Sequence, residues 1–108
     1  MIIGQDTRAN TIPILNEKAE NEIRMMESEA ANALEKKKPP QIAIEIYLKI
    51  LGKYPLWAPE MVNLTRLLIS IRENEQAKAI VKQAFEFYPT HPQLRELGTV
   101  LGIRLPQN

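Results

Sequence analysis

The sequence has no cysteine, only 4 glycines and few aromatic side chains. Because cysteine is absent, the chain has no disulfide framework, no thiolate metal site and no cysteine nucleophile. Its glycines do not form a phosphate-binding loop, and no interleaved aromatic residues support base stacking. No apolar run approaches the ~18 residues of a membrane span. The absences argue against disulfide-stabilised proteins, membrane-spanning proteins and phosphate-loop enzymes.

An excess of one charge sign is missing as well. The chain carries 14 Lys and Arg residues against 13 Asp and Glu residues, a formal net charge of +1. This balance argues against a polyanionic partner bound through bulk charge. The first few residues are too short and too acidic a segment for a signal peptide, so we expect a cytoplasmic protein without a membrane partner.

Side chains that could carry chemistry are sparse. His91, the only histidine, lies beside Pro92 without a cysteine, an aspartate or a second histidine at metal-ligand spacing, so we expect a capping or surface role. The sequence pairs no nucleophile with a base and shows no two carboxylates in an apolar context. We therefore expect a non-catalytic protein that has no catalytic residue, binds no metal and needs no cofactor.

The chain is organised around the segment 39–55, which reads PPQIAIEIYLKILGKYP. Its polar residues recur every four positions, which places them on one narrow stripe of a helix that begins near Pro40. These residues are Gln41, Glu45, Lys49 and Lys53. A helix that is apolar on nearly all its other sides is a buried helix. The spacing therefore predicts that other elements pack around this helix.

Further helices are expected on both sides of this segment. The first begins after Asn16, a suitable N-cap residue, and ends at the lysines of positions 36–38. Amphipathic spacing predicts another helix over residues 59–72. A fourth helix is expected over residues 75–88, with Asn74 as its cap.

The two ends of the chain differ in character. Thr90 and Gln93 have the spacing of a capping box, which predicts a short fifth helix that ends near Gly102. Residues 1–15 lack helical spacing, and we expect an extended or disordered arm there. The helical domain is accordingly expected over residues 16–108.

A 34-residue period relates the two halves of this domain. Pro55 and Pro89 are 34 residues apart (89 minus 55), and so are Ala43 and Ala77. The same offset relates Leu34 to Leu68 and Ile46 to Ile80. Paired helices that recur with this period are typical of the tetratricopeptide repeat, and the chain resembles that family. The resemblance covers repeats at about 24–57 and 58–91.

The family pattern has a small residue, a large residue four positions later and a proline eight positions beyond that. The chain follows the pattern twice, as Ala43-Tyr47-Pro55 and as Ala77-Val81-Pro89. The aromatic residues of the family's first helix are absent, so the repeats are degenerate. The resemblance implies an all-α fold in which antiparallel helix–turn–helix pairs, about five helices with a terminal helix at 92–102, stack as a short solenoid.

The resemblance also implies where a partner would bind. In this family the first helices of successive repeats line a concave groove that holds a peptide or a partner helix. The residues at matching positions of this chain are Asn32, Val62, Asn63, Arg66, Ile69 and Ser70.

A second interface is predicted from the comparison of the two repeats. Ile44 and Leu48 stand where the next repeat has Lys78 and Lys82. Burial of two such apolar side chains is worth roughly 3–6 kcal/mol. We therefore expect a cover for Ile44 and Leu48, which is either the N-terminal arm or a second chain, and a second copy of the protein is a candidate.

These features predict a protein–protein interaction module that acts as an adaptor, a chaperone or an assembly subunit. Its partner is expected to be another protein or a peptide. The alternative is a nucleic-acid or ribosome-associated protein that binds phosphate through basic side chains, although the balanced charge disfavours nucleic acid. The basic residues of that alternative are Lys36, Lys37, Lys38, Arg66, Lys78 and Lys82.

Overall fold

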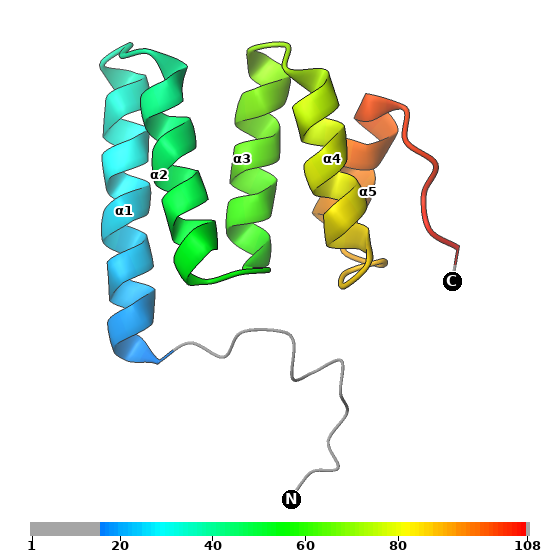
Figure 1. Ribbon diagram of the computed structural model, residues 1–108, viewed down its shortest axis with the longest axis horizontal. Coiled ribbons are helices and arrows are strands. Elements are labelled where there is room, and N and C mark those ends of the chain that lie inside the picture. The colour runs from blue at the N-terminus through cyan, green and yellow to red at the C-terminus, as the bar shows by residue number, and fades with distance from the viewer. Residues whose placement is uncertain (1–15, 108) are drawn as a thin grey trace, which may run out of the picture.

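The computed structural model of the chain describes residues 16–107. This part of the chain contains five α-helices and no strand. The helices are α1 (Glu17–Glu35), α2 (Pro40–Lys53), α3 (Ala58–Ser70), α4 (Asn74–Phe85) and α5 (Pro92–Leu101). Successive helices are antiparallel and lie side by side (Figure 1). The expected all-α stack of antiparallel helices is confirmed, and the expected N-terminal arm lies outside the described residues.

Local signals set most helix ends where the sequence predicts them. The side chain of Asn16 caps α1, because its Oδ1 accepts a hydrogen bond of 2.8 Å from the backbone N–H of Ala19. Pro40 is the first residue of α2, where a proline loses no helical hydrogen bond. Gly102 ends α5 with a φ of 74°, a left-handed conformation that favours glycine.

Two predicted caps are wrong by one residue. The N-cap of α5 is His91 rather than Thr90, and His91 Nδ1 accepts a hydrogen bond of 3.4 Å from the N–H of Leu94. This contact confirms the expected capping role of His91. Asn74 is already the first residue of α4, because the N–H of Glu73 donates to the carbonyl of Leu68 and closes the preceding turn early.

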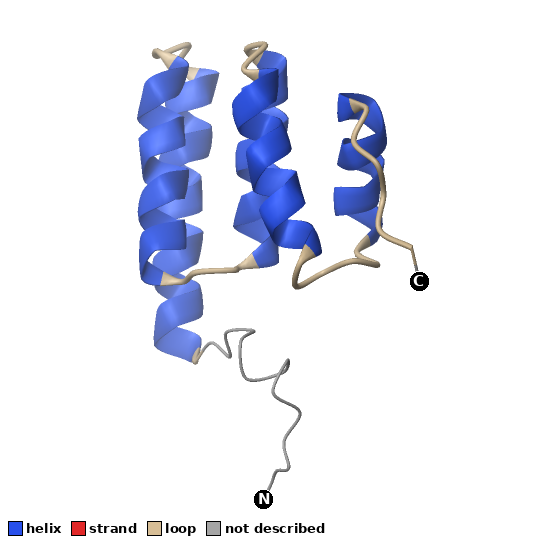
Figure 2. Cartoon of the chain, turned by 45° about the vertical axis from the view of Figure 1, so that its right-hand side comes forward, coloured by secondary structure: helices blue, strands red, loops and turns tan. Residues whose placement is uncertain are grey.

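The helices are arranged as pairs. In Figure 2, α1 lies with α2, α3 lies with α4, and α5 lies beside the C-terminal tail. Some residues 34 positions apart share their environment. Ala43 and Ala77 are both completely buried, whereas Leu34 is 36% exposed and Leu68 only 2%. The Tyr54 hydroxyl donates to the Glu22 carboxylate, and 34 positions later the Tyr88 hydroxyl donates to the carbonyl of residue 56. The sequence period therefore recurs in side-chain contacts.

One hydrophobic core runs through all five helices. Tyr47 and Leu68 lie in it, as the sequence predicts. No helix within residues 16–107 is long and apolar enough to cross a bilayer. Within residues 16–107 the second helix is not buried on nearly all sides, because α2 packs there only on α1 and α3. Its Ile42 remains 39% exposed and its Leu48 52% exposed.

The C-terminal tail covers the outer end of the stack. The Arg95 guanidinium fastens it, because one of its nitrogens donates to the carbonyls of Pro89 and Pro106 at 2.8 and 3.0 Å. Leu105 packs so closely on α5 that a Cβ built at Gly98 would lie 2.9 Å from its Cδ2. Glycine at this position therefore permits the contact between the tail and α5.

Candidate functional site

The residues predicted to line a groove lie on α1 and α3. Asn32, Arg66 and Ser70 are exposed, and Asn63 and Ile69 are half-buried. Val62 is only 3% exposed and belongs to the hydrophobic core, so its assignment to the groove is wrong. The physical reason is that α3 packs against α2, α4 and α5, which leaves only a narrow stripe of α3 open to solvent.

A cleft opens between α1 and the start of α3. These two helices do not pack directly on each other within the described chain. Side chains from both helices leave a cleft of about 290 Å³ between them. Its lining residues are Glu20, Ile23, Arg24 and Glu27 from α1 and Trp57 and Pro59 at the start of α3. The predicted groove residues do not include any of these six.

Behind this cleft lies a buried carboxyl group. Glu60, in the first turn of α3, is 0% exposed. Its Oε1 accepts a hydrogen bond of 3.3 Å from the side-chain amide of Asn63, whereas its Oε2 has no hydrogen-bond partner among the described residues. Burial, and then the neighbouring carboxyl of Glu27, raise the pKa of Glu60 to about 8. Glu60 is therefore mostly protonated at neutral pH.

Groups from three helices meet around this carboxyl. Glu27 comes from α1, Tyr47 from α2, and Glu60 with Asn63 from α3. Burial, together with the charges of Glu60 and Glu27, raises the pKa of the Tyr47 hydroxyl. A buried hydroxyl and a buried carboxyl thus lie next to Glu27, the member of the pair that also lines the cleft. The arrangement can bind a positive charge or a hydrogen-bond donor from the cleft side.

The expectation that no two carboxylates share an apolar context is wrong, because the fold brings Glu27 and Glu60 together from positions 33 residues apart. One signal was present in the sequence. Glu60 stands four residues before Leu64, which is 1% exposed, and so lies on the buried stripe of its helix. A glutamate in the first turn of a helix is also favoured by the helix dipole. Its presence at position 60 therefore does not by itself indicate a buried carboxyl.

The structure does not gather the basic residues of the nucleic-acid alternative into one patch. Lys36, Lys37 and Lys38 lie in the exposed turn after α1, and Arg66 lies on α3. Lys78 and Lys82 lie on α4, which packs on α3 and α5 but on neither α1 nor α2. Lys78 also forms an ion pair of 3.3 Å with Glu75. The lysines at positions 36–38 therefore lie on a different helix pair from Lys78 and Lys82.

The predicted apolar interface on α2 is only partly open. Ile44 is half-buried and packs against the core, whereas Leu48 is 52% exposed. No described residue covers Leu48, and its expected cover stays a prediction.

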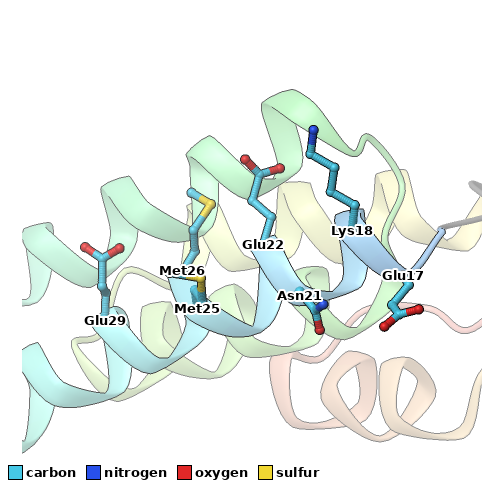
Figure 3. Close-up of a pocket in the computed structure, with 7 residues that line it drawn as sticks. All are labelled: Glu17, Lys18, Asn21, Glu22, Met25, Met26 and Glu29. Atoms are coloured by element: carbon cyan, nitrogen blue, oxygen red, sulfur yellow. The ribbon is translucent and has the colours of Figure 1, made fainter.

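A second hollow, shown in Figure 3, is lined by seven residues that all come from α1. Met25 there is 70% exposed. Glu22 is already occupied, because Lys53 and Tyr54 each bind its carboxylate at 2.6 Å. These two hydrogen bonds lower the pKa of Glu22. The hollow is the solvated face of one helix, and the cleft between α1 and α3 is the better candidate site.

A scan against protein-family models, a search of the curated proteins and a search of the solved structures found no match. The part of the chain from 16 to 107 holds no group of three or more His, Cys, Asp or Glu side chains that could bind a metal ion. The class of the molecule is thus defined by its own structure, an all-α stack of antiparallel helices with a cleft lined by Glu27 beside the buried carboxyl of Glu60.

Proposed function

We propose that the chain is a non-catalytic protein-binding module, a degenerate helical repeat of the tetratricopeptide kind, whose α1–α3 surface receives a peptide or a partner helix. The observation that carries the proposal is the cleft. Ile23, Trp57 and Pro59 supply apolar walls, and Glu27 supplies one polar group. Concave sites with an apolar lining and a few polar groups are typical of binding sites.

The size of the cleft defines what it can receive. A volume of about 290 Å³ lies at the lower end for ligand pockets, which are roughly 300–1,000 Å³. The cleft therefore suits one anchoring side chain of a larger partner. Protein interfaces commonly obtain most of their affinity from a few such anchors. The exposed residues Asn32 and Arg66 would contact the rest of the partner on the same two helices.

Two features support the repeat interpretation. The tyrosines 34 residues apart, Tyr54 and Tyr88, each donate a hydroxyl hydrogen bond to the residue 32 positions earlier. The C-terminal tail covers the end of the stack at Gly98, in the way that terminal repeats are capped in helical arrays. Adaptor, chaperone and assembly roles all use such a surface, and each is consistent with the proposal.

Site-specific photo-crosslinking in cells tests the proposal. A benzophenone amino acid replaces Glu20 at the exposed rim of the cleft, and the matched control carries it at Gln83, which is exposed on α4. A discrete protein adduct is expected from position 20 only. Adducts from both positions, or from neither, would contradict a partner site at this cleft. An adduct that nuclease treatment removes would instead support the nucleic-acid alternative.

A further inference from the structure

We propose that the α1–α3 cleft recognises an arginine side chain of the partner segment, with the carboxylate of Glu27 as its acceptor and the carboxyl of Glu60 behind it. The inference rests on the proposed function, because it names the chemistry of the partner at the same cleft. It depends on three independent features, which are an unsatisfied buried oxygen, an acidic group without an ion pair and an apolar wall.

The unsatisfied oxygen is Glu60 Oε2. It is buried and has no hydrogen-bond partner in the described part of the chain, while Asn63 serves the other oxygen of the same carboxyl. While Glu60 is protonated, its hydroxyl can donate to the carboxyl of Glu27; once Glu60 ionises, that hydrogen bond is lost and the buried oxygen needs a donor. A donor that approaches Glu27 from the cleft would supply positive charge next to this carboxyl.

Neither Glu27 nor Glu60 forms an ion pair within residues 16–107, so an external cation can bind beside them. The neighbouring group on α2 is the Tyr47 hydroxyl, and the neighbouring group on α3 is the amide of Asn63. On α1, Glu20 lines the cleft beside Glu27. Arg24 also lines the cleft. Its guanidinium donates to Asn21 Oδ1 at 2.9 Å, and Arg24 forms no ion pair with Glu27 within residues 16–107.

The walls of the cleft suit arginine. Ile23, Trp57 and Pro59 can pack against the aliphatic part of the side chain, and the indole ring of Trp57 can stack on a guanidinium. A guanidinium is planar, remains charged at any relevant pH and binds a carboxylate through two parallel hydrogen bonds. Lysine offers only a compact charge. The expected partner segment therefore presents an arginine between apolar residues.

This chemistry has a measurable signature, which is release of a proton on binding. In the free chain the neighbouring Glu27 and burial keep Glu60 protonated. A guanidinium next to the two side chains favours the ionised form of Glu60 and lowers the pKa of Glu60. Binding therefore favours the deprotonated chain, so the affinity should rise with pH up to about 8 and level off above it.

The experiment is an NMR titration of the full chain with the peptide acetyl-Ile-Arg-Leu-amide. The matched control peptide has citrulline, which is neutral and nearly the same shape, in place of arginine. The arginine peptide should shift the Trp57 indole signal and the backbone amides of Glu27 and Glu60. Its affinity should be more than about threefold higher at pH 8 than at pH 6, because one released proton allows up to tenfold per pH unit.

Variants of the full chain isolate the two carboxyls. Glu27→Gln should weaken binding of the arginine peptide and remove its pH dependence. Glu60→Gln copies the protonated side chain, so it should keep the fold but hold the affinity at the low value of pH 6 at every pH. Glu29→Gln, an exposed change on the helix that carries Glu27, is the control and should leave the affinity and its pH dependence unchanged.

Four results would overturn the inference. Equal affinity for the citrulline peptide would show that the cleft selects only apolar groups. Binding that is seen only with an Arg8→Gln variant would show that the chain's own N-terminal segment, and not a partner, supplies the arginine. Absence of peptide binding together with a crosslinked adduct at position 20 would refute the arginine while leaving the proposed function intact. Absence of peptide binding and of the adduct would refute the arginine inference and the proposed function together.

Discussion

Glu60 and Thr65 are both completely buried polar side chains of α3, yet they are stabilised differently. The Thr65 hydroxyl donates to the carbonyl of Met61 at 2.6 Å and is satisfied within its own helix. Glu60 has one contact, from Asn63, and one oxygen without a partner. Because ionisation of a buried carboxyl costs desolvation free energy, Glu60 keeps its proton and links the stability of the fold to pH.

Substitution of Glu60 by glutamine should remove this link. The pKa of Glu60 is raised from 4.5 to about 8, so the folded chain holds more protons than the unfolded chain between these values. The contribution of Glu60 to the free energy of unfolding should therefore be complete below pH 4.5 and fall as pH rises towards 8. The slope is at most about 1.4 kcal/mol per pH unit. Glutamine cannot ionise, so Glu60→Gln should be the more stable protein at pH 8.5.

Urea unfolding at pH 5.5, 7.0 and 8.5 measures the difference between the two proteins. Other titrating groups cancel in this comparison because both proteins share them. Glu29→Gln, which changes an exposed glutamate of α1, should follow the parent protein at every pH. Equal pH slopes for Glu60→Gln and the parent would show that the Glu60 carboxyl does not titrate in this range.

At the scale of the elements, each helix needs a cover for its apolar side, and α5 obtains part of its cover from the tail. Gly98 lies in the middle of α5, where glycine is usually unfavourable. Its position is explained by close contact, because Leu105 of the tail and the ring of Phe85 approach the site of its missing side chain. At Gly52, in the last turn of α2, no neighbouring atom lies within 4 Å of the position that a Cβ would occupy.

These two glycines provide a matched pair of alanine substitutions. Gly52→Ala should stabilise the chain by about 0.5–1 kcal/mol, because alanine favours the helix and meets no neighbour. Gly98→Ala gains the same preference, but its Cβ would lie 2.9 Å from Leu105 Cδ2 and 3.1 Å from Phe85 Cζ. Such overpacking should destabilise the chain by about 1–3 kcal/mol.

Chemical denaturation gives both free energies, and limited trypsin digestion reports on the tail. The displaced tail of Gly98→Ala should be cut faster after Arg104, which is exposed, than in the parent protein. If Gly98→Ala were as stabilising as Gly52→Ala, the tail would not be packed on α5 in solution.

At the scale of the whole molecule, the helices share one core rather than separate cores for each pair. The buried cluster includes Ile23 of α1, Leu68 of α3 and Leu101 of α5. The middle pair contacts both of its neighbours, since α3 packs on α2, α4 and α5. A continuous core of this kind in a small domain predicts one cooperative unfolding transition.

Leu68→Ala tests that continuity from the centre of the stack. Leu68 is 2% exposed, so the substitution should lower the free energy of unfolding by about 2–5 kcal/mol. Circular dichroism follows all five helices, and fluorescence of Trp57, the only tryptophan, follows the cleft. The two transitions should coincide and move together.

The control for this prediction is Arg66→Ala, an exposed change on the same helix that should stay within about 0.5 kcal/mol of the parent. Separate transitions for the two signals would show that the helix pairs unfold independently. A silent Leu68→Ala together with an unfolded Arg66→Ala would invert the assignment of the two faces of α3.

The helices, most of their ends and much of the core can be predicted from the amino-acid sequence alone. Asn16, Pro40 and Gly102 act through contacts within a few residues, and the buried stripe of each helix repeats every three or four positions. The 34-residue period can also be found in the sequence, because it relates residues of the same type at equivalent positions of the two repeats. These local patterns can be read without knowing which helices pack on one another.

The candidate site, in contrast, arises from the packing of the helices on one another. Glu27 and Glu60 become neighbours because α1 and α3 both pack on α2 at a spacing that no local pattern encodes. The same packing covers Val62, although its position on a repeat template indicates a groove, and leaves Leu48 open, although its helix is apolar on nearly all sides. Burial and pKa depend on which surfaces meet, and that is a property of the assembled helices rather than of any one of them.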